Sequence, residues 1–242
     1  MTPPHLTDPA LRVAHGFFTR EGGVSTGPYA SLNGSMSSDD DAELVASNRA
    51  RVLDALNPGG VLVGCHQVHG VAVAVVDRPW AAGEGPRADA MVTARPDATL
   101  VVITADCTPV LFADAGRGII GAAHAGWRGA VAGVLEATVA AMRSLGARDI
   151  RACVGPCIGQ DSYEVGADVA DQVDATFLHV GKPGHWWFDL AGYCSSRLAV
   201  PVTHARADTC ADSRFWSHRR HTLAGGGPIG HQMSAICNRF IE

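Results

Sequence analysis

The strongest constraint on the fold is the stretch from Pro109 to Gly126, where two apolar segments meet at a short turn-forming segment. The first reads PVLFAD, the second reads GIIGAAHAG, and DAGRG lies at their junction. Apolar runs of this length joined by a few residues that include glycine are typical of a β-hairpin. We therefore expect two adjacent antiparallel strands here.

The hairpin brings two chemically reactive side chains together. If its turn is centred between Ala115 and Gly116, Cys107 lies directly opposite His124. Directly opposed residues of an antiparallel pair have Cβ atoms about 4.5–5.5 Å apart on one face of the sheet. A shift by one residue would send the two side chains to opposite faces. In the expected register, the sequence predicts a Cys107–His124 pair.

Other segments predict a fold that mixes strands and helices. Helical spacing of apolar residues occurs in four segments, the first of which opens with acidic residues that can cap a helix: Asp39–Leu56, Trp127–Leu145, Gly166–Leu178 and Asp189–Ala199. Further strands are expected in two Val-rich segments on either side of the polar insert Cys65–Gly70, in ATLVVIT and in QMSAICNRFI. This mixture predicts an α+β or α/β fold with a mixed, largely central sheet, and with no linker or repeat we expect one domain over residues 1–242.

Composition limits the class of function. Lys and Arg number 19 against 24 Asp and Glu, the net charge is −5, and no basic run occurs. We therefore expect small-molecule chemistry rather than binding to nucleic acid or to an anionic membrane surface. No apolar stretch reaches the roughly 18 residues of a membrane span, and the start MTPPHLTDPA lacks the regions of a signal peptide. We expect a soluble, cytoplasmic protein.

The seven cysteines are interpreted as thiols. Their number is odd, and a chain of 242 residues can be stable without disulfide bonds. Cys153 and Cys157 lie in CVGPCIG without a second such pair, so we interpret them as structural thiols rather than zinc ligands.

Two chemical interpretations of Cys107 and His124 stay open. The imidazole can act as base for a nucleophilic thiolate, or both side chains can bind a metal such as zinc or copper. A third interpretation is a small core cysteine beside a hydrogen-bonded histidine. A third ligand would favour the metal, and HQVHG offers His66 and His69 at the end of a strand.

Two residues next to this pair are further candidates for the site. Arg128, in GWRGA, stands at an expected helix start, where free N–H groups and a guanidinium attract anions such as phosphate, although a surface ion pair would also explain it. Asp106 either orients Cys107 or a histidine, or makes an ordinary hydrogen bond at the end of its strand.

Several motifs together resemble a known family. FTREGGVS, HQVHG, ADAMVT, TADCTPVLFAD, AAHAGWRGA and GPCIGQDSYEVG are similar, in this order, to the YfiH or laccase-domain proteins, also called the multicopper polyphenol oxidase family. The resemblance covers nearly the whole chain. It implies a YfiH-like fold, similar to the catalytic domain of cytotoxic necrotizing factor and to CheD, in which a Cys–His pair performs hydrolysis.

The resemblance also implies a metal site and several activities. In the family, zinc is bound by the Cys and His of the matching motifs and by the second His of HQVHG. The resemblance therefore implies zinc ligands at Cys107, His124 and His69. Family members act as purine nucleoside phosphorylases on adenosine, inosine, guanosine and methylthioadenosine, with adenosine deamination as a second activity. Copper-dependent oxidation of phenols and correction of peptidoglycan precursors are alternative assignments, and a metal-free Cys107–His124 hydrolase or amidase is another.

The sequence helps to rank these activities. A laccase needs a His₂Cys copper centre and a histidine-rich trinuclear cluster, usually with paired H-x-H motifs, and the 11 histidines here include no such pair. Phosphorolysis needs a site for phosphate, a pocket for the base and stabilisation of a cationic ribose. We therefore favour a zinc-dependent phosphorylase.

The favoured activity gives each candidate residue a role. His69, Cys107 and His124 hold the metal, Cys107 and His124 act in catalysis, and Asp106 orients a ligand. Arg128 and Arg20 bind phosphate, and Asn33 lines the substrate pocket. The chain departs from the family pattern at His218, where Tyr is common, and at His231, where Arg is common. A homodimer is a further expectation.

Overall fold

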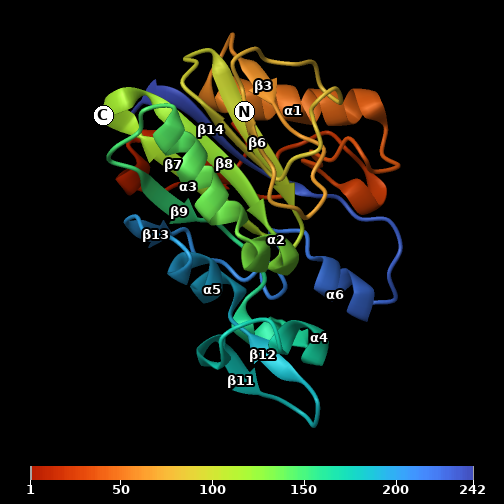
Figure 1. Ribbon diagram of the computed structural model, residues 1–242. Coiled ribbons are helices and arrows are strands. Elements are labelled where there is room, and N and C mark those ends of the chain that lie inside the picture. The colour runs from red at the N-terminus through yellow and green to blue at the C-terminus, as the bar shows by residue number, and fades with distance from the viewer. Residues whose placement is uncertain (1, 242) are drawn as a thin grey trace.

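The computed structural model describes residues 2–241, and within them the strands form two large sheets and one small one (Figure 1). The five-stranded sheet has the order β1 (His5–Leu6), β2 (Val13–Phe18), β14 (Gln232–Phe240), β6 (Ala98–Thr104) and β3 (Val61–Val63). The six-stranded sheet has the order β13 (Val202–His204), β9 (Arg151–Val154), β7 (Thr108–Asp114), β8 (Ile119–Ala125), β5 (Ala90–Thr93) and β4 (Val73–Val75). The small sheet has the order β10 (Glu164–Val165), β12 (Trp186–Phe188) and β11 (Leu178–Val180). Both large sheets contain parallel and antiparallel pairs, which confirms the expected α/β fold with mixed sheets.

The helices only partly follow the predicted segments. They are α1 (Ala42–Leu56), α2 (Trp127–Ala132), α3 (Val134–Ser144), α4 (Ala167–Ala170), α5 (Leu190–Ser196) and α6 (His218–Leu223). Short 3₁₀ turns are η1 (Pro9–Leu11), η2 (Gly27–Tyr29), η3 (Ala115–Arg117), η4 (Gln160–Ser162) and η5 (Ala175–Phe177). The α1 prediction is confirmed, with Asp41 as the N-cap that accepts hydrogen bonds from the N–H groups of Glu43 and Leu44.

Two of the predicted helices are wrong in extent. The segment predicted as one helix from Trp127 to Leu145 is divided at Gly133, whose φ of 102° lies in the left-handed region that ends helices. The segment Gly166–Leu178 forms only the short α4 before η5 and β11. There, the Asp174 carboxylate accepts hydrogen bonds from the N–H and hydroxyl of Thr176, which starts the separate turn η5.

The two large sheets pack face to face between helices. Side chains such as Leu100, Val102, Leu111 and Ile120 fill the space between the sheets. Residues of α1 cover the outer face of the five-stranded sheet, and α3 covers the outer face of the six-stranded sheet (Figure 1). The result is a four-layered sandwich in which the chain passes from one sheet to the other between β6 and β7.

The predicted hairpin is formed by β7 and β8, but its register differs from the expected one. Asp114 pairs with Ile119, so the turn is centred between Gly116 and Arg117, one position later than expected. Pro109, not Cys107, therefore lies opposite His124. Cys107 lies in the bend directly before β7, and its Sγ still comes within 4.8 Å of a ring nitrogen of His124.

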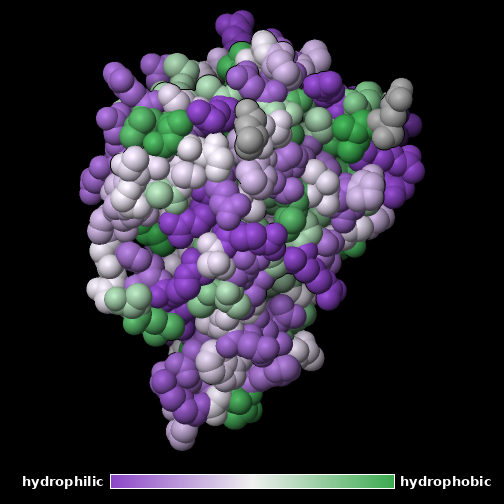
Figure 2. Space-filling view, turned by 180° about the vertical axis from the view of Figure 1, so that it is seen from behind, coloured by the Kyte–Doolittle hydropathy of each residue, from purple (hydrophilic) through white to green (hydrophobic). Residues whose placement is uncertain are grey.

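The surface seen from behind mixes hydrophobic and hydrophilic side chains (Figure 2). In the view from behind, hydrophobic side chains occur in small groups dispersed among hydrophilic ones (Figure 2). Such a mixture is normal for a face exposed to water. None of the helices in residues 2–241 is long and apolar enough to cross a membrane.

Candidate metal centre

Three side chains from separate parts of the chain meet at one end of the sandwich. His69 comes from the loop between β3 and β4, Cys107 from the connection between β6 and β7, and His124 from the end of β8. Their ligand atoms all lie within 4.8 Å of one another. His69 is exposed, Cys107 is half-buried and His124 is buried, so the cluster opens to solvent on the His69 side.

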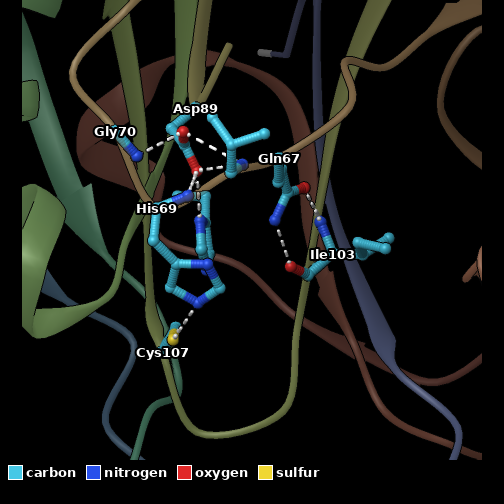
Figure 3. Close-up of polar contacts among 8 residues, drawn as sticks. Gln67, His69, Gly70, Asp89, Ile103 and Cys107 are labelled. Atoms are coloured by element: carbon cyan, nitrogen blue, oxygen red, sulfur yellow. Dashed lines mark hydrogen bonds and ion pairs between the residues drawn. The ribbon is translucent and has the colours of Figure 1, made fainter. Parts of the chain in front are cut away.

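The loop that carries His69 is held in place by backbone hydrogen bonds. His69 has a left-handed φ of 59°, which is unusual for a residue other than glycine. This conformation directs the N–H groups of Val68, His69 and Gly70 toward the carboxylate of Asp89 at 2.7–3.2 Å (Figure 3). Gln67 exchanges two hydrogen bonds with the backbone of Ile103 and fixes the loop to β6.

Asp89 also orients the second histidine. Its Oδ1 lies 2.9 Å from Nδ1 of His124, and both side chains are almost completely buried. Because Nδ1 is used by Asp89, Nε2 of His124 is the ring nitrogen left for a ligand. The His69 and His124 rings lie edge to face, with centroids 4.7 Å apart.

Cys107 completes the cluster at a position that requires a glycine nearby. Its Sγ lies 3.9 Å from Nε2 of His69. A Cβ atom on Gly126 would lie 2.9 Å from the His69 ring and 3.0 Å from the Cys107 sulfur. Any larger residue at position 126 would therefore displace the cluster.

The electrostatics of the cluster favour a thiolate. Burial opposes ionisation of Cys107, but the adjacent His124 and His69 outweigh it and lower the pKa of the thiol to about 6. Burial opposes ionisation of His124 as well and by itself would lower its pKa. The charges of Cys107 and Asp89 outweigh burial and raise the pKa of His124 to about 9. The thiolate is the form of cysteine that binds metals and acts as a nucleophile.

The donor set fits a metal ion. One thiolate sulfur and two imidazole nitrogens are ligands for zinc or copper, and three protein ligands leave a coordination position open. A carboxylate hydrogen-bonded to the other ring nitrogen, as Asp89 is to His124, is commonly found behind metal-binding histidines. The cluster can therefore bind a metal ion.

The cluster lies in the wall of a cavity of about 780 Å³, a volume within the range of small-molecule sites. Its lining includes three arginines, two aromatic residues and one aliphatic residue: Arg49, Arg128, Arg219, Trp127, Tyr163 and Ile158. His218 and His231, the two positions that depart from the family pattern, also line it. Thus the GPCIG loop reaches the cavity through Ile158.

Of the predicted anion-binding residues, the structure brings only Arg128 to the cavity. Arg128 is exposed, and its guanidinium lies 4.5 Å from the centre of the Trp127 ring. Arg20 lies outside the cavity wall, where Nε and Nη2 donate to the carbonyl of Ala30 and the guanidinium stacks on Trp216.

Asn33 and Asp106 have roles in positioning other segments. Asn33 is buried behind the wall, and its side chain donates to Asp40 and accepts from the N–H of His231. The Asp106 carboxylate accepts from Thr209, from Ser217 and from the N–H of Arg219. Within residues 2–241 it makes no hydrogen bond to His69, Cys107 or His124, so it anchors α6 beside the cavity.

All seven cysteines are free thiols, as expected, and Cys153 and Cys157 are buried in the core. Three residues important to the site were not singled out from the sequence: Asp89, Gly126 and Arg49. The one sequence signal for a role of Asp89 is its position as a charged residue directly before the apolar run AMVT.

Fold and site together define an α/β protein with mixed sheets and a Cys–His–His cluster in the wall of a deep cavity. The family model described as multi-copper polyphenol oxidoreductase laccase matches residues 14–239. The chain belongs to this family, in agreement with the resemblance of its motifs.

Individual relatives agree with this assignment. A protein of Deinococcus radiodurans named purine nucleoside phosphorylase is 48% identical over 230 residues, covering 90% of this chain and 87% of the relative. The crystal structure of YlmD from Geobacillus stearothermophilus matches with a TM-score of 0.87 and 31% identity, covering 96% and 94% of the two chains. That of the hypothetical protein YfiH from Bacillus licheniformis matches with a TM-score of 0.85 and 29% identity, covering 92% and 91%. The expected YfiH-like fold is confirmed.

Proposed function

We propose that this protein is a zinc-dependent purine nucleoside phosphorylase. Its substrates are inorganic phosphate and adenosine, inosine, guanosine or methylthioadenosine, and adenosine deamination is a second activity. The observation that carries the proposal is a three-ligand cluster in the wall of a cavity that is also lined by arginines. The Deinococcus radiodurans relative named for this activity, at 48% identity, supports it.

The chemistry of the donor set favours zinc, with copper as the alternative ion. In this proposal His69 Nε2, Cys107 Sγ and His124 Nε2 hold the ion, and Asp89 fixes the orientation of His124. When bound, zinc supplies a Lewis acid at the wall of the cavity.

The protein side chains have separate tasks in phosphorolysis. The bond between C1′ of the ribose and the purine nitrogen breaks, an oxygen of hydrogen phosphate forms a new bond to C1′, and the base leaves with the proton that the phosphate gives up. Arg128 neutralises part of the phosphate charge at the rim of the cavity. Trp127 and Tyr163 offer aromatic surfaces on which a purine can stack. Arg20 and Asn33 act from behind the wall by holding the segments that form it. Asp106 lines the cavity and holds α6 beside it.

A metal-free cysteine hydrolase is the second candidate. His124 stands between Cys107 and Asp89, which is the order of nucleophile, base and orienting carboxylate in cysteine hydrolases. In that case a chelator would leave turnover intact, whereas the zinc-dependent activity would be lost.

The proposal is tested by measuring release of hypoxanthine from inosine with and without phosphate. We compare the wild-type protein with Cys107→Ala and with Cys210→Ala, a half-buried cysteine outside the cavity wall. We expect phosphate-dependent release in the wild type and in Cys210→Ala and its loss in Cys107→Ala. Equal release without phosphate, or equal release by Cys107→Ala, would contradict the proposal.

A further inference from the structure

The cavity has an excess of positive charge, although the chain as a whole carries a net charge of −5. Three arginines line it, Arg49, Arg128 and Arg219, and one carboxylate does, that of Asp106. The Asp106 carboxylate already accepts hydrogen bonds from Thr209 and from the backbone of Arg219. A cleft lined by one sign of charge raises the local concentration of ligands of the opposite sign.

Arg49 is half-buried and has few partners of its own. It lies on α1 and its Nη1 donates one hydrogen bond, 3.1 Å long, to the carbonyl of Gly34. Its Nη2 lies beside Gly64, since a Cβ on that glycine would be 3.4 Å away. No carboxylate within residues 2–241 forms an ion pair with Arg49. A guanidinium has five N–H donors, so most of the hydrogen-bonding capacity of Arg49 is unused within residues 2–241.

Burial makes this lack of partners costly. Removal of Arg49 from solvent lowers its pKa to about 10, so that the side chain is still charged at neutral pH. A half-buried charge without an opposite charge beside it is unfavourable in the ligand-free protein, and a ligand that supplies the opposite charge relieves this cost.

The other two arginines of the cavity are better compensated. Arg128 is exposed to water and stacks on Trp127. Arg219 donates to the carbonyl of Glu164 at 2.8 Å and lies 5.5 Å from the Tyr163 ring. The position in the wall with an unsatisfied, partly desolvated cation is therefore that of Arg49.

We infer that Arg49 binds a phosphate-type oxyanion inside the main cavity. A guanidinium fork matches two phosphate oxygens at once, which explains an arginine rather than a lysine here. The oxyanion has two sources: the inorganic phosphate that would be the co-substrate, or a phosphate group carried by a nucleotide. The first source rests on the proposed phosphorylase function, whereas the second is independent of it.

The test measures binding directly, with the zinc-loaded protein. Inorganic phosphate and, separately, adenosine monophosphate are titrated calorimetrically into the wild type, Arg49→Met and Arg51→Met. Arg51 is the matched control because it lies on the same helix, is exposed and does not line the cavity. Methionine retains the apolar stem of arginine, and thermal unfolding of each variant verifies that it is folded.

We expect Arg49→Met to weaken binding of at least one of the two ligands by about tenfold or more, as for a lost charge-assisted contact, and Arg51→Met to bind both like the wild type. An effect on phosphate identifies the free ion as the source, and an effect on the nucleotide alone identifies the attached phosphate. Unchanged affinity of folded Arg49→Met for both ligands would overturn the inference, as would a wild type that binds neither. If phosphate binds through Arg49 but no base is released, the inference stands and the proposed function fails.

Discussion

Asp89 shows how a single buried residue can organise the site without being a ligand. Its carboxylate accepts three backbone N–H groups of the loop that carries His69 and also holds Nδ1 of His124. Burial disfavours its charged form, but the hydrogen bonds from His124 and Gly70 outweigh this and lower the pKa of Asp89. Asp89 thus couples the positions of two of the three candidate ligands.

We predict that Asp89→Asn weakens zinc binding by about 10- to 100-fold, because the neutral amide orients His124 less firmly and lowers its basicity. Competition against a zinc indicator measures the affinity. Asp54→Asn, a change of an exposed carboxylate on α1, should bind zinc like the wild type. A folded Asp89→Asn protein with unchanged zinc affinity would show that the carboxylate does not support the metal site.

The sequence allowed the three cluster residues to be predicted, but not the residues around them. Cys107 and His124 follow from the hairpin, and His69 follows from the resemblance of its motif. The roles of Asp89 and Gly126 depend on the left-handed backbone at His69 and on contacts across loops, which no periodicity reports. The prediction that Arg20 binds phosphate in the cavity misses such a contact across loops as well. Arg20 lies outside the cavity wall and donates to the carbonyl of Ala30.

Among the secondary-structure elements, long strands and the capped helix α1 were predicted well, whereas exact register and helix breaks were not. The hairpin turn is centred one residue later than expected, because η3 contains Ala115–Arg117 and Gly118 ends it in a left-handed conformation. Pro109 therefore pairs with His124 in place of Cys107, but the side chains of Cys107 and His124 still lie close together. The break between α2 and α3 depends on one glycine inside an otherwise helical pattern.

We predict that Gly133→Ala lowers the free energy of unfolding by about 1–2 kcal/mol, since alanine is strained at a φ of 102°. A clash with residues farther along the chain does not contribute, because the nearest such atom to a Cβ at this position is in Glu136, 3.6 Å away. Urea denaturation measures the change. Gly116→Ala is the control because Gly116 has no positive φ and its Cβ would meet only Asp114 at 3.7 Å. Equal losses in both variants would contradict this explanation of the helix break.

At the scale of the whole molecule, the packing of two mixed sheets explains why the site lies where it does. The chain crosses from β6 to β7 at one end of the sandwich, and β8 ends there too, so Cys107 and His124 meet beside the loop that carries His69. The α/β class followed from alternating strand and helix patterns, but the pairing order of the strands is set by long-range packing. The cavity, likewise, is built from segments that are distant in the sequence.

The most direct test of the proposed zinc-dependent phosphorylase activity is a titration of the metal-free protein with zinc. Metal-free protein, prepared with a chelator, receives increasing amounts of zinc, and phosphate-dependent release of hypoxanthine from inosine is measured at each ratio. We expect release to rise in proportion to bound zinc and to reach its maximum at one zinc ion per chain. Full release by the metal-free protein, or no release at any ratio of zinc to protein, would contradict the proposed activity.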